Sequence, residues 1–237
     1  MSENSAFTKA KHYVESHVHD GDAARKGTVG PCITISREAG AGSGLMAEKL
    51  ILLLSPISKD QNAPWAVFDK NLIEKVLEDH HLPKQIAKFL GEEKRSLLTQ
   101  TMNEMLGVHP PLLKLYHKET ETILHLAHVG NCVLIGRGAN IITASVKNAF
   151  HIRLIAPLEL RIKNVQEFYG NTKIEAVDFV KKEDVKRNAF IKDHFNKNAE
   201  DPLLYHAVIN TGCFSLDEVA KIVADSVITK FPKYFVE

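Results

Sequence analysis

The chain has 237 residues, 44% of them apolar, which is enough to bury a sizeable core as one domain with an insertion or as two small ones. Its 30 basic and 29 acidic side chains leave a formal charge of +1, which argues against a global field that draws the protein to nucleic acid or an anionic membrane. Three dispersed cysteines and the lack of an apolar run of roughly 20 residues argue against a disulfide framework, a cysteine-based zinc site and a membrane helix. With a polar N-terminus that lacks the apolar segment of a signal peptide, we expect a cytoplasmic protein.

Residues 1–28 carry three histidines, mixed charges and few large apolar side chains. This composition predicts an N-terminal arm, either mobile or forming a loosely attached helix. The main domain is then expected over residues 29–237.

Short apolar runs of β-type residues alternate with longer helical stretches over the rest of the chain. The runs lie at 32–35, 66–68, 132–135, 150–155 and 207–209. This alternation predicts an α/β fold with a parallel central sheet. Between the runs, residues 71–130 have a mostly helical pattern that predicts a helical insertion, and residues 156–205 are helical and rich in charge.

Two helices carry apolar stripes suited to packing on a sheet. The first begins near Gly44, and the last follows a capping box at Ser215-Leu-Asp-Glu218. We expect the following side chains to face the core: Met46, Leu50, Leu53, Leu54, Val219, Ile222, Val223 and Val227.

A glycine-rich turn links the first predicted strand to its helix. Gly40, Gly42 and Gly44 allow a phosphate to approach closely, because backbone N–H groups at a helix N-terminus bind anions without any side chain. Against the pattern G-x-x-x-x-G-K-[ST], only Gly44 matches, and the other fixed positions hold Ala39, Leu45 and Met46. The turn therefore predicts either a phosphate-binding loop without its lysine or a simple connector.

Polar side chains flank this turn. Arg37 stands directly before it, where a guanidinium reaches phosphate oxygens or forms an ordinary ion pair with Glu38. Ser36 and Ser43 offer hydroxyl groups to a phosphate or to a metal-bound water. The histidines at 80–81, 125 and 128 lack a third spaced ligand and are interpreted as core or surface residues rather than a zinc site.

The segment Ser36-Arg37-Glu38, followed by Gly40-Ala-Gly42-Ser43, resembles the opening of the cytidylate kinase-like proteins, which are P-loop relatives of nucleoside monophosphate kinases. Further blocks similar to that family follow in order at 68–73, 130–138, 156–161, 184–187 and 205–211. Those relatives also lack the loop lysine. The resemblance implies a P-loop kinase-like three-layer fold in which residues 71–130 bind the acceptor and residues 158–204 form a lid.

The resemblance also implies roles for individual residues. Arg137 would grip the α-phosphate of the acceptor, although a structural arginine bonded to loop carbonyls is the alternative. Asp69 would face the acceptor, or would cap the helix that follows it. Arg161 and Arg187, on the lid, would join Arg37 in supplying the positive charge that a loop lysine otherwise supplies.

The implied function is transfer of the ATP γ-phosphoryl group, with Mg²⁺, to a nucleoside monophosphate such as CMP or dCMP. The phosphates of ATP would lie on Ser36, Gly40, Gly42, Ser43 and Gly44, and the metal ligands stay open. The sequence departs from the family at Gly44, where a basic residue is common, and at His206, where an aspartate is common. Two alternatives stay open: a non-catalytic nucleotide-binding or regulatory protein, and a kinase with another small-molecule acceptor.

Overall fold

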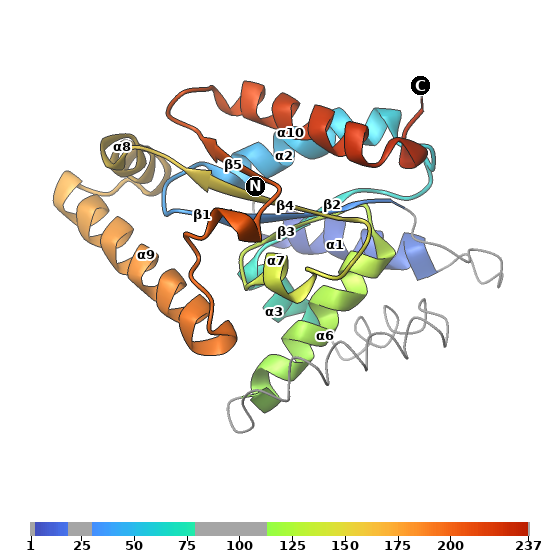
Figure 1. The fold of residues 1–237 in the computed structure, drawn as a ribbon, viewed down its shortest axis with the longest axis horizontal. Helices are drawn as coiled ribbons and strands as arrows, with labels where there is room; N and C mark the ends of the chain where they lie inside the picture. Colours follow the sequence, from blue (N-terminus) through green and yellow to red (C-terminus); the bar gives the residue numbers. More distant parts are fainter. Residues whose placement is uncertain (1–2, 19–29, 79–112, 237) are drawn as a thin grey trace.

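The computed structural model describes residues 3–18, 30–78 and 113–236. Within these ranges five strands form one parallel sheet in the order β2-β3-β1-β4-β5 (Figure 1). Their bounds are β1 Cys32–Arg37, β2 Ala66–Phe68, β3 Cys132–Ile135, β4 Ala149–Ile155 and β5 Ala207–Asn210. The α/β class and the parallel central sheet predicted from the sequence are confirmed.

Helices cover both faces of this sheet, which gives three layers (Figure 1). One face carries α2 Ser43–Leu54 and α10 Leu216–Lys230, and the other carries α1 Glu3–Val18, α3 Lys70–Glu78, α6 Leu113–Val129 and α7 Ala139–Ile142. Short 3₁₀ turns lie at Ser55–Ile57, Pro202–Leu204 and Pro232–Tyr234. The ends of the predicted 71–130 insertion are helical, and its middle, 79–112, lies outside the described residues.

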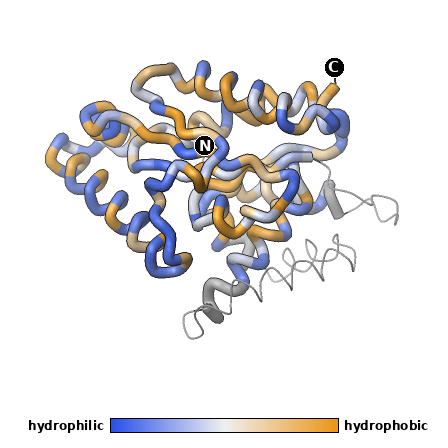
Figure 2. The backbone as a smooth tube through the Cα atoms, viewed as in Figure 1, coloured by the Kyte–Doolittle hydropathy of each residue, from blue (hydrophilic) through white to orange (hydrophobic). Residues whose placement is uncertain are grey.

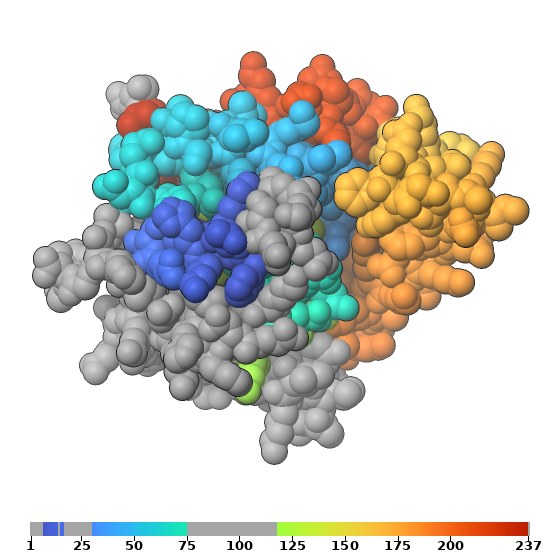
Figure 3. Space-filling view, turned by 180° about the vertical axis from the view of Figure 1, so that it is seen from behind, coloured from blue at the N-terminus to red at the C-terminus, as the bar shows by residue number. Residues whose placement is uncertain are grey.

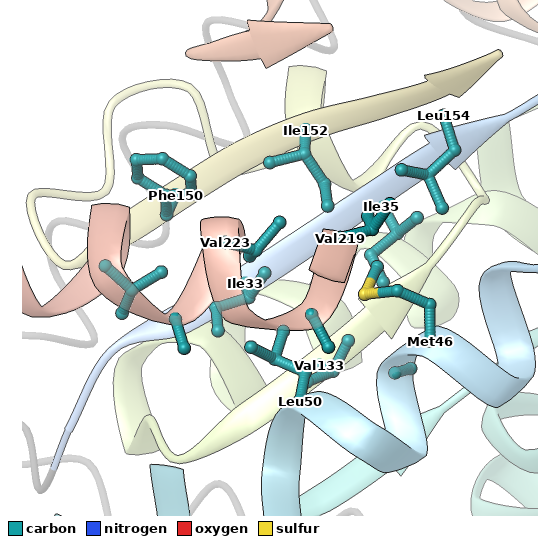
Figure 4. Packing of buried hydrophobic residues seen from close by; sticks show 14 of the residues in the cluster. Ile33, Ile35, Met46, Leu50, Val133, Phe150, Ile152, Leu154, Val219 and Val223 are labelled. Atoms are coloured by element: carbon teal, nitrogen blue, oxygen red, sulfur yellow. The ribbon is translucent and has the colours of Figure 1, made fainter. Parts of the chain in front are cut away.

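Alternation along the strands builds two hydrophobic clusters, one on each side of the sheet. Ile33 and Ile35 of β1 face α2 and α10, where they lie in one cluster with Met46 and Val223 (Figure 4). Cys32 faces the opposite way, into a cluster with side chains of α1, α3 and α6. Because both faces of the sheet are covered, its strands are apolar on both sides, as parallel sheets require.

The predicted helix stripes are wrong at one position each. Leu53 is 43% exposed and Ile222 is 38% exposed, whereas the other predicted stripe residues are buried. The small residues Ala47, Ala220 and Ala224 occupy the buried face in their place. A helix buries a stripe of limited width. Because the side of each helix that carries the alanines faces inward, Leu53 and Ile222 on the other side face solvent.

The first helix packs against the sheet. Residues 3–18, where we expected an arm or a loosely attached helix, form α1, and its Ala10 and Tyr13 are buried. The Tyr13 hydroxyl donates to the Gly130 carbonyl at 2.5 Å, and its ring contacts Phe68 edge-on at 5.4 Å. None of the helices in the described ranges combines the length and the apolar character that crossing a bilayer requires.

Two helices stand apart from the layers. Helices α8 Leu158–Tyr169 and α9 Lys173–Phe195 form one flank of the molecule, beside α2 and α10 when it is seen from behind (Figure 3). Their residues are mostly hydrophilic, in contrast to the central sheet (Figure 2). A capping box, in which Thr172 and Glu175 bond each other's backbone N–H, starts α9. The lid role of residues 158–204 stays a prediction.

Candidate functional site

A cavity of about 300 Å³ lies where β1, β3 and β4 approach their carboxyl ends, with α9 forming its other wall. Ligands of open α/β sheets bind at this edge. Six basic side chains line it: Arg37, Lys70, Arg137, Arg153, Lys186 and Arg187. Acidic residues also line it, but the excess of positive charge makes the cavity suited to an anion.

Arg37, the last residue of β1, is the lining arginine whose guanidinium has neither an ion pair nor a hydrogen bond among the described residues. Its guanidinium forms no hydrogen bond or ion pair with any residue in the described ranges, although the residue is more than half buried. Burial, and then the charge of Arg187, lowers the pKa of Arg37 to about 9, so it remains charged at pH 7. A charge removed from water without a partner is costly, and a bound anion would relieve that cost.

Gly136 makes room for this guanidinium. The first residue after β3, it adopts a φ of +81°, and a Cβ at this position would lie 2.2 Å from Nη1 of Arg37. Only glycine allows both the backbone angle and the close approach. The end of β3 therefore fixes where the Arg37 side chain lies.

Arg187, on α9, supplies a second positive charge beside Arg37. It donates from Nη1 to the Arg37 carbonyl at 3.5 Å and lies 3.7 Å from Glu183. Burial lowers the pKa of Arg187, and the neighbouring carboxylates oppose that shift. Two guanidinium groups held this close repel each other unless an anion lies between them, which is the arrangement of a phosphate site.

Arg153 is a site residue that our sequence reasoning missed. It pairs in register with Ser36 on the neighbouring strand, so both side chains lie on the same face of the sheet. Arg153 donates to Ser36 Oγ at 3.2 Å and lies 6.0 Å from the ring centroid of Tyr205, whose hydroxyl also donates to Ser36 Oγ at 3.2 Å. A charged residue inside the apolar run 150–155 was the available signal.

Arg137 follows β3 and lines the same cavity. It has a φ of +55°, which is rare for a residue other than glycine or asparagine. Its Nη2 donates to both Glu74 and Glu119, at 3.1 Å for the second, and its guanidinium lies 5.7 Å from the ring centroid of Phe190. Burial raises the pKa of Glu119, and Arg137 opposes that shift. Arg137 is therefore already paired with carboxylates rather than with loop carbonyls.

The glycine loop lies beside the cavity. Ser36 lines the cavity, whereas Gly40, Gly42, Ser43 and Gly44 do not. Gly40 and Gly42 have φ values of +79° and +81°. In the described part of the chain, no acceptor bonds the N–H groups of residues 43–45 at the start of α2. These orphan donors keep the predicted capacity for phosphate, without any side chain from Leu45, which is 51% exposed.

Arg161 lies outside the cavity and holds the loop in place. The residue is buried, and its guanidinium bonds Asp184 and lies 3.4 Å from Glu38. It also donates to the carbonyls of Ala156 and Ala39, at 3.0 and 3.3 Å. All of these partners fasten α8 and α9 to the loop, which is a structural arrangement.

Asp69 also lies outside the lining of the cavity. Its Oδ1 accepts from the Leu72 N–H at 2.9 Å, which is the helix-capping alternative. Its charge is close enough to raise the pKa of Arg37 against the effect of burial. Among the described residues, no group of three or more His, Cys, Asp or Glu side chains has the arrangement of a metal site.

Residues 32–212 match the cytidylate kinase-like family. The chain belongs to this family. Its three-layer sheet is accordingly the P-loop kinase-like fold predicted above. A solved structure of an uncharacterized protein from Eubacterium ventriosum aligns over 84% of this chain and 98% of its own, with a TM-score of 0.64 and 19% identity.

Two other proteins are similar over part of the chain or with a lower TM-score. A shikimate kinase structure from Bacteroides thetaiotaomicron aligns over 83% of this chain and 98% of its own, with a TM-score of 0.44 and 12% identity. The uronate isomerase of Corynebacterium glutamicum is 27% identical over 119 residues, which are 50% of this chain and 23% of that protein. The cytidylate kinase-like chain thus spans less than a quarter of the length of this curated relative.

Proposed function

We propose that this cytidylate kinase-like protein transfers the γ-phosphoryl group of ATP to a nucleoside monophosphate, with CMP or dCMP as the acceptor. Phosphoryl transfer asks for little covalent chemistry from a protein. It requires two substrates in line, positive charge around the moving group, and the exclusion of water. The family and the arginine-lined cavity both support this proposal.

The observation that carries the proposal is the unpaired guanidinium of Arg37 at the end of β1. Other arginines around the loop and cavity have carboxylate or hydroxyl partners: Glu38 and Asp184 for Arg161, Glu74 and Glu119 for Arg137, Glu183 for Arg187, and Ser36 for Arg153. Arg37 has none among the described residues. In the proposed reaction it binds the transferring phosphoryl group and takes the place of the absent loop lysine.

The neighbouring elements supply the remaining functions. Arg153 and Ser36 hold each other beside Arg37, and α9 brings Arg187 to the same place. The free N–H groups at the start of α2 bind the other phosphates of ATP. Residues 158–204 act as the lid, because α9 walls the cavity and carries Arg187.

Mg²⁺ fits this cavity as an ion held mainly by phosphate and water. Magnesium commonly takes only one or two carboxylates from the protein, so a site without a three-ligand cluster suits it. Glu183 and Glu200 are among the carboxylates that line the cavity and would be available to the ion. When bound, Mg²⁺ neutralises part of the charge on the phosphates of ATP.

The absence of the lysine favours a second candidate, a nucleotide-binding protein without catalysis. The exposed Leu45 adds nothing to phosphate binding, so the loop offers backbone donors and the Ser43 hydroxyl but no positive charge. In that case ATP still binds and raises the melting temperature, but no ADP forms.

The test is ADP release from ATP with an acceptor panel of CMP, dCMP, UMP, AMP, GMP and small alcohols. We expect ADP with CMP or dCMP, and a loss of roughly 100-fold in turnover for Arg37→Met, as for a missing transition-state donor. Lys163→Met is the matched control, because its exposed ammonium pairs with Glu167 on α8, outside the cavity. ADP release that Arg37→Met leaves intact would contradict the assigned role, and ATP binding without any ADP would support the second candidate.

A further inference from the structure

Two buried polar atoms of the cavity lining have no hydrogen-bond partner among the described residues. Asn140, in α7, is only 6% exposed, and its side chain forms no hydrogen bond with any described residue. The Nε of Arg137 is also buried and unpartnered, and both residues line the cavity. An unpaired buried donor costs about 1–3 kcal/mol, so such groups are rare without a function.

A second buried asparagine, Asn148, has a side-chain amide with a structural role in the same fold. Asn148 is also 6% exposed, but its Nδ2 donates to the carbonyls of Gly30 and Ala127, at 3.0 and 2.9 Å. It ties the start of β1 to α6 and lies outside the cavity lining. Asn140 has the same chemistry and the same burial but no such bonds, so holding the fold together does not explain it.

The charge around these atoms argues against a phosphate as their partner. Arg137 bonds two carboxylates, Glu74 and Glu119, so its own charge is balanced. The unbalanced positive charge is on Arg37, with Arg187 beside it. The cavity thus offers positive charge on one pair of residues and, on Asn140 and Arg137, hydrogen bonds without an excess of charge.

We propose that Asn140 and the Nε–H of Arg137 bind the uncharged part of the phosphoryl acceptor, at a hydroxyl or carbonyl oxygen. The phosphates then lie against Arg37 and Arg187. This inference rests on the proposed function, and it changes the role of Arg137 from gripping the acceptor's phosphate to binding its nucleoside part. Glu74 and Glu119 orient Arg137 by holding Nη2, which leaves Nε free for the ligand.

The experiment compares two asparagine variants by calorimetry, with CMP and inorganic pyrophosphate as probes. Asn140→Leu should weaken CMP binding at least about 10-fold, because the hydrogen bond is lost, and should change pyrophosphate binding less than about twofold. It should not lower the melting temperature, because it removes an unpaired polar group. Asn148→Leu, the matched control, should lower the melting temperature by several degrees and leave CMP binding unchanged.

Three results would overturn the inference. They are equal losses of CMP and pyrophosphate binding in Asn140→Leu, a loss of stability like that of Asn148→Leu with unchanged CMP affinity, and a wild-type protein that binds pyrophosphate but no nucleoside monophosphate. The proposed function fails separately: CMP binding that depends on Asn140, without ADP release, contradicts transfer and supports the inference. ADP release by Asn140→Leu at the wild-type KM for CMP contradicts the inference and supports transfer.

Discussion

Two arginines near the glycine loop, Arg161 and Arg37, have opposite environments. Arg161 is buried among two carboxylates and two carbonyls, and it fastens the loop to α8 and α9. Arg37 lies at the end of β1 beside another arginine, with no ion pair of its own among the described residues. The sequence made both of them candidates for catalysis, but their partners separate them.

The polar residues of this site fall into two kinds by their hydrogen-bond partners. A buried polar group whose bonds are complete within the protein stabilises the fold, and its removal leaves the partners unpaired. A buried polar group without a protein partner lowers stability, and a bound ligand would relieve that cost. Arg161 and Asn148 belong to the first kind, and Arg37 and Asn140 to the second.

The largest expected effect is on stability at the first kind of residue. Arg161→Met leaves Asp184 and Glu38 without their cation and should lower the free energy of unfolding by about 3–5 kcal/mol. Urea denaturation followed by circular dichroism measures this. A change within about 0.5 kcal/mol, which is the change expected for the exposed Lys163→Met, would contradict a stabilising role for Arg161.

Two neighbouring histidines, His151 in β4 and His206 just before β5, should make the stability of the fold depend on pH. His151 bonds Thr34 Oγ1 at 2.9 Å through Nδ1, and burial, then His206 and Lys230, lowers the pKa of His151 to about 4. Its backbone N–H also donates to His206 Nδ1 at 2.8 Å, and burial lowers the pKa of His206 as well. His206 accepts at Nδ1 only while its ring is neutral, and burial favours the neutral form of His151.

The sign of the pH effect follows from that neutrality. The unfolded chain takes up a proton at His151 near pH 6.5, and the folded protein does so only near pH 4. The stability is therefore complete above pH 6.5 and falls as the pH drops toward 4, by up to about 3 kcal/mol. Thermal unfolding across pH 4–7 should show a shallower dependence in His151→Asn, and equal slopes would contradict this assignment.

Gly136 offers a smaller change that acts on Arg37 without altering it. Gly136→Ala places a methyl group against Nη1 of Arg37 and forces alanine into a left-handed conformation, at a cost of about 1–2 kcal/mol. We expect this loss of stability together with a loss of ADP formation of about tenfold. Gly170→Ala is the control, because it has the same backbone strain and an open surrounding. If both variants lose activity equally, the contact with Arg37 is unimportant.

The smallest expected effect is at the start of α9. Thr172→Ala removes the side chain that caps this helix and should lower stability by about 1 kcal/mol. The matching change in the other capping box, Ser215→Ala, tests whether α9 matters especially for the site. Both variants should lose similar stability, but only Thr172→Ala should raise the KM for ATP, because α9 carries Arg187.

The fold was predictable because its signals are local. Each strand is a short, mostly apolar run, β3 is buried throughout and β1 over its first four residues, and the capping boxes mark the starts of α9 and α10. Arg37 lies at the carboxyl ends of the parallel strands because it is the last residue of β1. The stripes failed at Leu53 and Ile222 because periodicity alone does not say which edge of a stripe faces the core.

The partners of the site residues were not predictable in the same way. Arg161 and Asp184 are on different helices, and Arg137 meets carboxylates 63 and 18 residues away. Such pairings depend on how elements pack, which composition and spacing do not give. Arg153 left a signal, a charge in an apolar strand, whereas nothing in the sequence near Asn140 indicates that its amide is unpaired.

The most direct test of the proposed roles measures Arg37→Met and Arg161→Met side by side, for stability and for ADP formation from ATP and CMP. We expect Arg37→Met to be at least as stable as the wild type and to lose about 100-fold in turnover. We expect Arg161→Met to lose about 3–5 kcal/mol of stability and, where still folded, to keep most of its turnover. The opposite pattern, with Arg37 needed for stability and Arg161 for turnover, would contradict the division between residues that hold the fold and residues that bind the ligand.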